Sequence, residues 1–168
     1  RSSTRPSWVS RRRITTLPSS PARTSSPLSS SAPNRAGGRT AVTVGARAVQ
    51  ELMGYTGAGI GVAIVDSGVT NWHDDLSNAN LQGQRVTRFV DFVNGQTVPY
   101  DDWGHGTHVA GIVAGNGYDT LGTRNAIAPG ANIIALKALN GEGTSTISTI
   151  IAAIDYAVTN KDALNIRV

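Results

Sequence analysis

Cysteine is absent from this chain of 168 residues, so the sequence offers neither a disulfide framework nor a thiolate metal site. No run of about 18 apolar residues occurs, so no segment is expected to span a membrane. The residues near the start of the sequence also lack the apolar stretch of about 7–15 residues typical of a secretory signal. The lack of cysteine fits an exported enzyme and a cytosolic one equally well.

Acidic residues are absent from the first 50 positions, which carry nine arginines. The remainder of the chain carries six basic residues against all eleven acids. The formal net charge of +4 therefore comes from the N-terminal segment alone. It gives little support to a nucleic-acid-binding protein, because the segment holds one aromatic residue, Trp8, and no basic helix.

Residues 1–40 differ in composition from the rest of the chain. Serine, threonine, proline and arginine make up 27 of the first 35 residues. Such a segment buries too little apolar surface to offset its chain entropy, so we expect a disordered basic tail. Three origins fit this tail: a linker or the remnant of a pro-segment, a transit-type peptide, or translation of GC-rich DNA in a wrong reading frame.

After residue 40, apolar residues alternate between helical and strand spacing. Apolar residues at i, i+3, i+4 and i+7 predict helices with one buried face, and continuous β-branched runs predict strands buried on both faces. Helices are expected over 44–53, 107–114 and 146–158, and strands over 60–65, 86–93, 132–139 and 164–168. Thr144 or Ser145 is expected to cap the last helix. This order predicts an α/β fold with a mainly parallel sheet, whose functional sites lie at the carboxyl ends of the strands.

Two short motifs carry candidate catalytic residues. Asp66 follows the apolar run 60–65 and enters a Ser-Gly turn, while His105 lies between Gly104 and Gly106 at the start of a predicted helix. A carboxylate at a strand end holds an imidazole in one tautomer, and a partly exposed imidazole reaches a nucleophile. Taken alone, each residue also fits a structural role, as a turn aspartate or as a hydrogen-bonded histidine at a helix start.

Other uses of these motifs are less well supported. His105 and His108 have the i, i+3 spacing of a zinc pair, but no third ligand lies in the motif, so we predict no metal site. We expect His108 to face the packing surface of its helix. A dinucleotide site at Gly57, Gly59 and Gly61 is excluded, because these glycines precede the predicted strand instead of following it.

Together the motifs resemble those of the subtilisin-like serine proteases (subtilases). The matching segments are GVAIVDSGV (61–69), HGTHVAGIVAG (105–115), IAPGANIIALKAL (127–139) and GEGTSTISTIIAAIDYAV (141–158). They occur in the family's order and at about its spacing. The resemblance implies that residues 41–168 form a partial peptidase domain. Its fold would be an incomplete, three-layer, doubly wound, mainly parallel sheet, preceded by the disordered tail of residues 1–40.

The resemblance also implies an activity. It predicts a serine endopeptidase that hydrolyses peptide bonds through an Asp-His-Ser triad and an acyl-enzyme, in which Asp66 orients His105 as general base and then acid. The substrate backbone would pair with an edge strand formed by Leu139, Asn140, Gly141 and Gly143. It further implies polypeptide substrates, a monomer when complete, an extracellular or periplasmic location, and no membrane or nucleic-acid partner.

The chain departs from the family's pattern at the nucleophile. The family's Gly-Thr-Ser-Met-Ala-x-Pro segment does not occur in this sequence. Gly143-Thr144-Ser145 lacks the Ala-x-Pro continuation, so Ser145 is better interpreted as a helix cap than as a nucleophile. We expect the serine to be encoded downstream and this chain to be inactive alone. The alternatives are a truncated pseudoenzyme or peptide-binding fragment and, more remotely, a nucleic-acid-binding protein.

The family's cofactor habits give a weaker expectation. No cofactor is required for the reaction, but a structural calcium ion is compatible with loop 116–125, which carries the oxygen ligands of Asn116, Asp119 and Asn125. The segment His73-Asp74-Asp75-Leu76 resembles the family's His-Pro-Asp-Leu, and we interpret His73 as structural.

Overall fold

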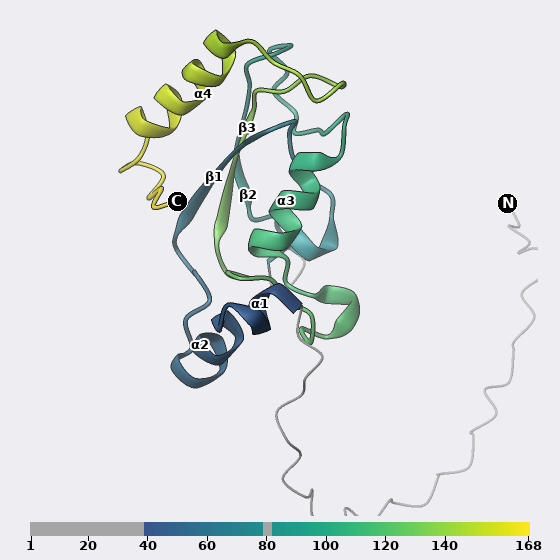
Figure 1. The fold of residues 1–168 in the computed structure, drawn as a ribbon, viewed down its shortest axis with the longest axis vertical. Coiled ribbons are helices and arrows are strands. Elements are labelled where there is room, and N and C mark those ends of the chain that lie inside the picture. Colours follow the sequence, from purple (N-terminus) through teal and green to yellow (C-terminus); the bar gives the residue numbers. More distant parts are fainter. Residues whose placement is uncertain (1–38, 79–81) are drawn as a thin grey trace, which may run out of the picture. The chain divides into compact units, whose positions relative to one another are not determined.

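The computed structural model describes residues 39–78 and 82–168, and its centre is a three-stranded parallel sheet (Figure 1). Strands β1 (Gly61–Asp66), β3 (Asn132–Lys137) and β2 (Val86–Asp91) lie side by side in that order. The predicted tail of residues 1–40 lies outside the described residues except for Arg39 and Thr40, which begin helix α1.

Two helices cover the sheet on opposite faces, as Figure 1 shows. Helix α3 (His105–Ala114) packs on the face that carries Ile133 and Ala135, and helix α4 (Ile147–Thr159) packs on the face that carries Ile134 and Leu136. Strand β3 is therefore buried on both sides, as expected for the centre of a parallel sheet. The layers α3, sheet and α4 confirm the predicted α/β architecture.

The chain returns to the sheet at residues 164–168, where a strand is predicted. Gly61 forms a parallel bridge with Ile166, Ala63 N–H donates to the carbonyl of Val168 at 2.8 Å, and Arg167 N–H donates to the carbonyl of Gly61 at 3.0 Å. This pairing extends the sheet beyond β1, but as a bridge instead of a full strand.

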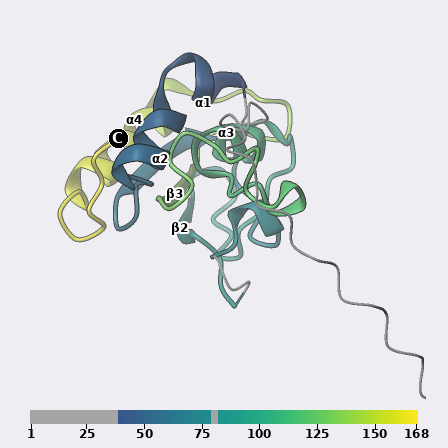
Figure 2. The same ribbon diagram turned by 90° about the horizontal axis from the view of Figure 1, so that it is seen from below.

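The helix predicted over 44–53 is α2 (Ala46–Met53), and a short helix that the sequence did not predict, α1 (Arg39–Thr43), precedes it. They are separated by Gly45, whose φ of 79° is a left-handed conformation that interrupts a helix. Both lie at the end of the sheet where β1 begins (Figures 1 and 2). Gln50 anchors α2 there, because its Nε2 donates to the carbonyls of Ala126 and Ile127, each at 2.8 Å.

Strand β2 ends at Asp91, two residues before the predicted end, because this side chain folds the following backbone into a turn. Its carboxylate accepts the N–H groups of Val93 and Asn94 at 2.8 and 2.9 Å and the hydroxyl of Tyr100 at 2.8 Å. Burial raises the pKa of Asp91, but these hydrogen bonds outweigh it and hold the pKa below its ordinary value.

Helix α4 differs from its prediction in its cap and in its buried face. The hydroxyl of Thr146, and not that of Thr144 or Ser145, accepts the N–H of Thr149 at 3.2 Å and caps the helix. Ile150, Ala153 and Ala157 pack on the sheet. The other apolar side chains of the predicted face are exposed, with Ile147 at 79%. The exposed set is Ile147, Ile151, Ile154 and Val158.

A buried arginine ties the edge of the sheet to its surroundings. Arg85 directly precedes β2, and its guanidinium donates to four backbone carbonyls at 2.5–3.0 Å. These carbonyls belong to Ser77, Ala131, Asp75 and Ala114. Burial lowers the pKa of Arg85, and the nearby charge of Asp75 opposes that shift. The side chain thus joins β2 to the ends of α3 and of the 3-10 turn η1 (Asp74–Leu76).

Candidate active site

The carboxyl ends of the three strands lie level with one another. Asp66, the last residue of β1, pairs in register with Lys137, the last residue of β3, and Lys137 pairs with Asp91 of β2. Three ionisable residues therefore meet at one edge of the sheet. This is the edge at which the sequence predicts a functional site.

Asp66 and His105 form a close pair at this edge. Nδ1 of His105 lies 2.8 Å from Oδ1 and 2.9 Å from Oδ2 of Asp66, and the N–H of Ser67 donates to Oδ1 at 2.7 Å. An ionised carboxylate only accepts hydrogen bonds, so we assign the imidazole proton to Nδ1. The His105 side chain is 51% exposed and that of Asp66 is 12% exposed, which leaves Nε2 able to accept a proton from an incoming group.

Glycine at position 106 is what allows helix α3 to start against the end of β1. A Cβ atom on Gly106 would lie 3.1 Å from Cβ of Asp66 and would overlap the carbonyl oxygen of Gly68. The N–H of Gly106 donates to the hydroxyl of Ser67 at 3.0 Å. A side chain at position 106 would push His105 away from its carboxylate.

A second carboxylate, Asp101, organises the segment that carries His105. It accepts the N–H and hydroxyl of Thr107 at 2.8 and 2.6 Å, the N–H of Gly104 at 2.8 Å and the hydroxyl of Ser67 at 2.8 Å. Burial raises the pKa of Asp101, but these hydrogen bonds outweigh it, so the pKa lies below its ordinary value. No role was predicted for Asp101. Its position a few residues before the start of a helix could have indicated that it binds the first N–H groups of that helix.

We expect Asp101→Asn to weaken the dependence of stability on acid pH. Because the pKa of Asp101 is lowered by folding, its contribution is fully present above the unfolded-state pKa of about 3.9 and is lost as pH falls through the lower folded-state value. Urea unfolding between about pH 6 and 2 measures this dependence. Asp119→Asn, at an exposed position, is the matched control. Equal acid dependence in both variants would contradict the assignment.

Lys137 lies beneath the site with no exposed surface. Its ammonium group donates to the carbonyl of Ser67 at 2.6 Å, to Oδ1 of Asp102 at 2.6 Å and to the carbonyl of Leu139 at 2.9 Å. It also lies 4.9 Å from the ring centroid of Tyr100. One buried cation therefore connects the end of β1, the segment before α3 and the segment after β3. This role of Lys137 was not predicted, because a single lysine in an apolar strand does not indicate which groups it will contact.

The predicted substrate-binding residues Leu139, Asn140, Gly141 and Gly143 form a turn in this structure, not an extended edge strand. The N–H of Gly143 donates to the carbonyl of Asn140 at 3.0 Å, and the N–H of Asn140 donates to the carbonyl of Thr144 at 2.9 Å. The amide oxygen of Asn140 accepts the N–H groups of Glu142 and Thr144, both at 3.0 Å. An asparagine that caps its own loop in this way favours a turn over a strand.

Comparison with known proteins identifies the family. The sequence model of the Subtilase family matches residues 57–168. The chain belongs to the subtilase family. Serine protease AprX of Bacillus subtilis (strain 168) is 43% identical over 103 residues, which cover 61% of this chain and 22% of AprX. Subtilisin E of the same organism is 40% identical over 116 residues, which cover 67% of this chain and 27% of subtilisin E.

Solved structures agree with the subtilase fold. A cold adapted subtilisin-like serine proteinase is similar with a TM-score of 0.52 and 30% identity, over 63% of this chain and 34% of that one. The CspB protease of Clostridium perfringens has a TM-score of 0.62 at 22% identity, over 79% of this chain and 31% of that one, and supports the fold alone. The chain thus spans about a fifth to a third of the length of these proteins.

The serines of the described residues are all engaged away from His105. The hydroxyl of Ser145, the alternative weighed from the sequence, donates to the carbonyl of Ala138 at 2.5 Å. Ser67 is fully buried and donates to Asp101. Ser77 and Ser148 bond to their own turn and helix start. Within residues 39–78 and 82–168, the side-chain hydrogen bonds of His105 go to Asp66 alone.

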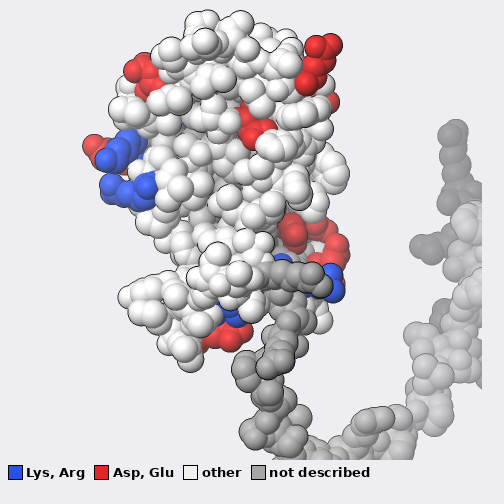
Figure 3. Space-filling view, in the orientation of Figure 1, with Lys and Arg blue, Asp and Glu red and all other residues white. Residues whose placement is uncertain are grey.

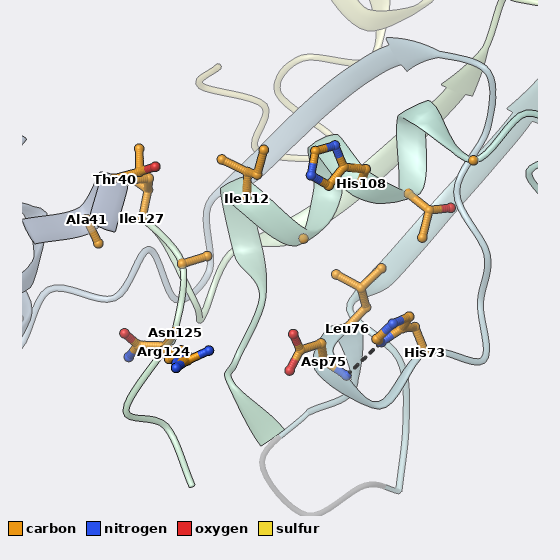
Figure 4. Close-up of a pocket in the computed structure, with 14 residues that line it drawn as sticks. Thr40, Ala41, His73, Asp75, Leu76, His108, Ile112, Arg124, Asn125 and Ile127 are labelled. Carbon is orange, nitrogen blue, oxygen red and sulfur yellow. Dashed lines mark hydrogen bonds between the residues drawn. The ribbon is translucent and has the colours of Figure 1, made fainter. Parts of the chain in front are cut away.

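The prediction that His108 faces a packing surface is wrong. His108 is exposed and lines a cavity of about 520 Å³ on the outer side of α3, away from the sheet (Figure 4). Its imidazole is turned outward because the small residues Ala110 and Ala114 hold α3 against the sheet. His73 lies at the same cavity, and its Nδ1 accepts the N–H of Asp75 at 3.2 Å, a structural contact.

Loop 116–125 fits a calcium ion poorly as it stands. The side-chain oxygens of Asn116 and Asp75 both accept the N–H of Tyr118, at 2.9 and 2.8 Å, and the loop closes on itself around the 3-10 turn η2 (Tyr118–Thr120). The amide oxygen of Asn125 is buried and has no hydrogen-bond partner. Among the described residues, no group of three or more His, Cys, Asp or Glu side chains is placed to hold a metal ion.

Proposed function

We propose that this chain supplies the aspartate and histidine of an Asp-His-Ser triad in a serine endopeptidase. The observation that carries the proposal is the pair of contacts between Nδ1 of His105 and the carboxylate of Asp66, which leaves Nε2 directed to an incoming hydroxyl. The nucleophilic serine would come from the part of the catalytic domain that the relatives have and this chain does not cover.

The reaction would follow from this geometry. Nε2 of His105 accepts the proton of the serine hydroxyl as its oxygen attacks the peptide carbonyl, and Asp66 stabilises the imidazolium that forms. The imidazolium then gives the proton to the departing amine, which leaves an acyl-enzyme. A water molecule activated by the same nitrogen hydrolyses it. Asp66 holds the ring in this orientation throughout, because it accepts the hydrogen bond of Nδ1–H of His105 and is itself held by the N–H of Ser67.

The substrates would be polypeptides that lie along the segment of Leu139, Asn140, Gly141 and Gly143. Hydrogen bonds to the backbone there would give affinity for many peptide sequences. To form them, the turn would have to open or the substrate would have to pair beside it. The face in Figure 3 shows Lys and Arg in small separate groups near acidic residues, a pattern that favours a peptide over a nucleic acid.

We further propose that the complete enzyme is exported and acts as a monomer without a cofactor, and that loop 116–125, whose Asn116 oxygen is already engaged, binds no structural calcium ion. The minor extracellular protease Epr of Bacillus subtilis is 39% identical over 110 residues. No helix among the described residues is long and apolar enough to cross a membrane. Calcium titration followed by thermal unfolding tests the loop, where a rise in the melting temperature indicates binding.

The test is expression of the longest reading frame that contains this sequence, followed by a casein assay. We expect hydrolysis that phenylmethylsulfonyl fluoride abolishes, and no hydrolysis by the 168-residue chain alone. Robust, reagent-sensitive activity of the short chain would contradict the assignment of the serine. Peptide binding without hydrolysis by the long product would favour a pseudoenzyme, the second candidate.

A further inference from the structure

One aromatic side chain at the site has no role in the pair just described. Trp103 lies two residues before His105, and the two ring centroids are 5.3 Å apart with 32° between the ring planes. Trp103 is 48% exposed, so burial in a core does not explain its position. Its indole instead lies against the imidazole of His105, in a segment whose sequence gave no reason to expect an aromatic residue.

The six-membered ring of the indole also lies against the turn after β3. A Cβ atom on Gly143 would lie 2.5 Å from Cζ2 and 2.6 Å from Cζ3 of Trp103. Gly143 also has a φ of 73°, a left-handed conformation that favours glycine. The indole therefore bridges His105 and the turn that is proposed to bind substrate.

The backbone that carries Trp103 is held on both sides. Asp102 accepts a hydrogen bond from the buried ammonium of Lys137 at 2.6 Å and lies against Gly141, whose Cβ would be 3.2 Å from its Oδ2. The N–H of Gly104 is bound to Asp101 at 2.8 Å. Because the main chain is anchored at each neighbour, the freedom of the indole is limited to its own side-chain rotations.

We propose that Trp103 is a positioning residue that couples the turn at Gly143 to the imidazole of His105. The hydrogen bond to Asp66 fixes one ring atom, and contact with the indole limits rotation of the ring plane about that bond. Together the two contacts fix the direction in which Nε2 points. The inference rests on the proposed function for its catalytic consequence, but the packing on which it depends is a property of this chain alone.

The first test is NMR spectroscopy of the 168-residue chain. The indole ring current acts on the ring protons of His105, so Trp103→Leu is expected to move these resonances toward their unstructured values, while Trp103→Phe retains part of the shift. Trp72→Leu is the matched control, because Trp72 stacks on His73 with centroids 5.9 Å apart and should affect His73 alone. Unchanged His105 resonances in Trp103→Leu, with those of His73 intact as evidence of folding, would overturn the proposal.

The coupling is tested by a double-mutant cycle. Gly143→Ala should displace the indole and shift the His105 resonances, and it should have little further effect in the Trp103→Leu background. Additive effects would show that the turn acts on His105 by another route.

In the complete enzyme, Trp103→Leu should lower kcat about tenfold and change KM by no more than about twofold. A base that is held in the wrong orientation slows the reaction more than it weakens substrate binding. A raised KM with unchanged kcat would make Trp103 a substrate contact and overturn the proposal. An inactive parent enzyme would refute the proposed function, and the NMR result alone would then decide whether Trp103 positions the ring of His105.

Discussion

His105→Ala in the complete enzyme is expected to lower kcat by about 10⁶, the loss known for the triad histidine of a subtilisin. Among the described residues, the imidazole is the one group bonded to Asp66 that leaves a second nitrogen exposed, so its removal leaves no base for the proton of the proposed serine. Asp66→Asn should cost about 10⁴, because an amide donates to Nδ1 and favours the wrong tautomer. Steady-state hydrolysis of a peptide substrate measures both.

His108→Ala is the matched control for this prediction. It removes the same side chain three residues along the same helix, at an exposed position with no contact to Asp66. Its activity should stay within about twofold of the parent enzyme. An Asp66→Asn variant with full activity would show that the observed pair is structural, and it would remove the basis of the proposed mechanism.

Arg85→Met is expected to destabilise the folded chain by about 3–5 kcal/mol. The substitution keeps an apolar stem of similar length, but it leaves four carbonyls from three separate segments without the donor that joins them. Urea unfolding followed by circular dichroism measures the loss as a lower midpoint with an unchanged slope.

Arg88→Met, three residues further along in β2, is the matched control for Arg85→Met. Arg88 is exposed, so its replacement should change the free energy of unfolding by no more than about 0.5 kcal/mol. If the two variants unfolded at the same urea concentration, the carbonyls around Arg85 would have found other donors, and its bridging role would be wrong.

The sequence predicted the parts of the molecule that depend on local pattern. The apolar run before Asp66 and the glycines around His105 placed both residues at strand and helix ends, and the parallel sheet then brought those ends together. The alternation of strands and helices also predicted a parallel sheet, but it did not predict the order β1-β3-β2. These features need no knowledge of which side chains finally touch.

The parts that failed depend on contacts between distant residues. The helical spacing of apolar residues predicted that the whole apolar face of α4 is buried. Within the described residues only the side that includes Ala153 packs on the sheet, and Ile147 stays exposed. The turn at Asn140 is an exception, because the side chain of Asn140 accepts the N–H groups of Glu142 and Thr144, which are local contacts. Lys137 is buried against a carboxylate 35 residues away in sequence, a distance that no local pattern reports.

The short sequence separation within the Asp66–His105 pair has a consequence for synthesis. The groups that hold the two residues together come from segments no later than the turn at Gly143, and chains emerge from the ribosome N-terminal end first. The Asp66–His105 pair can thus be assembled while later codons are still being read. If the proposed nucleophile is encoded further on, it would meet an imidazole that is already held in place.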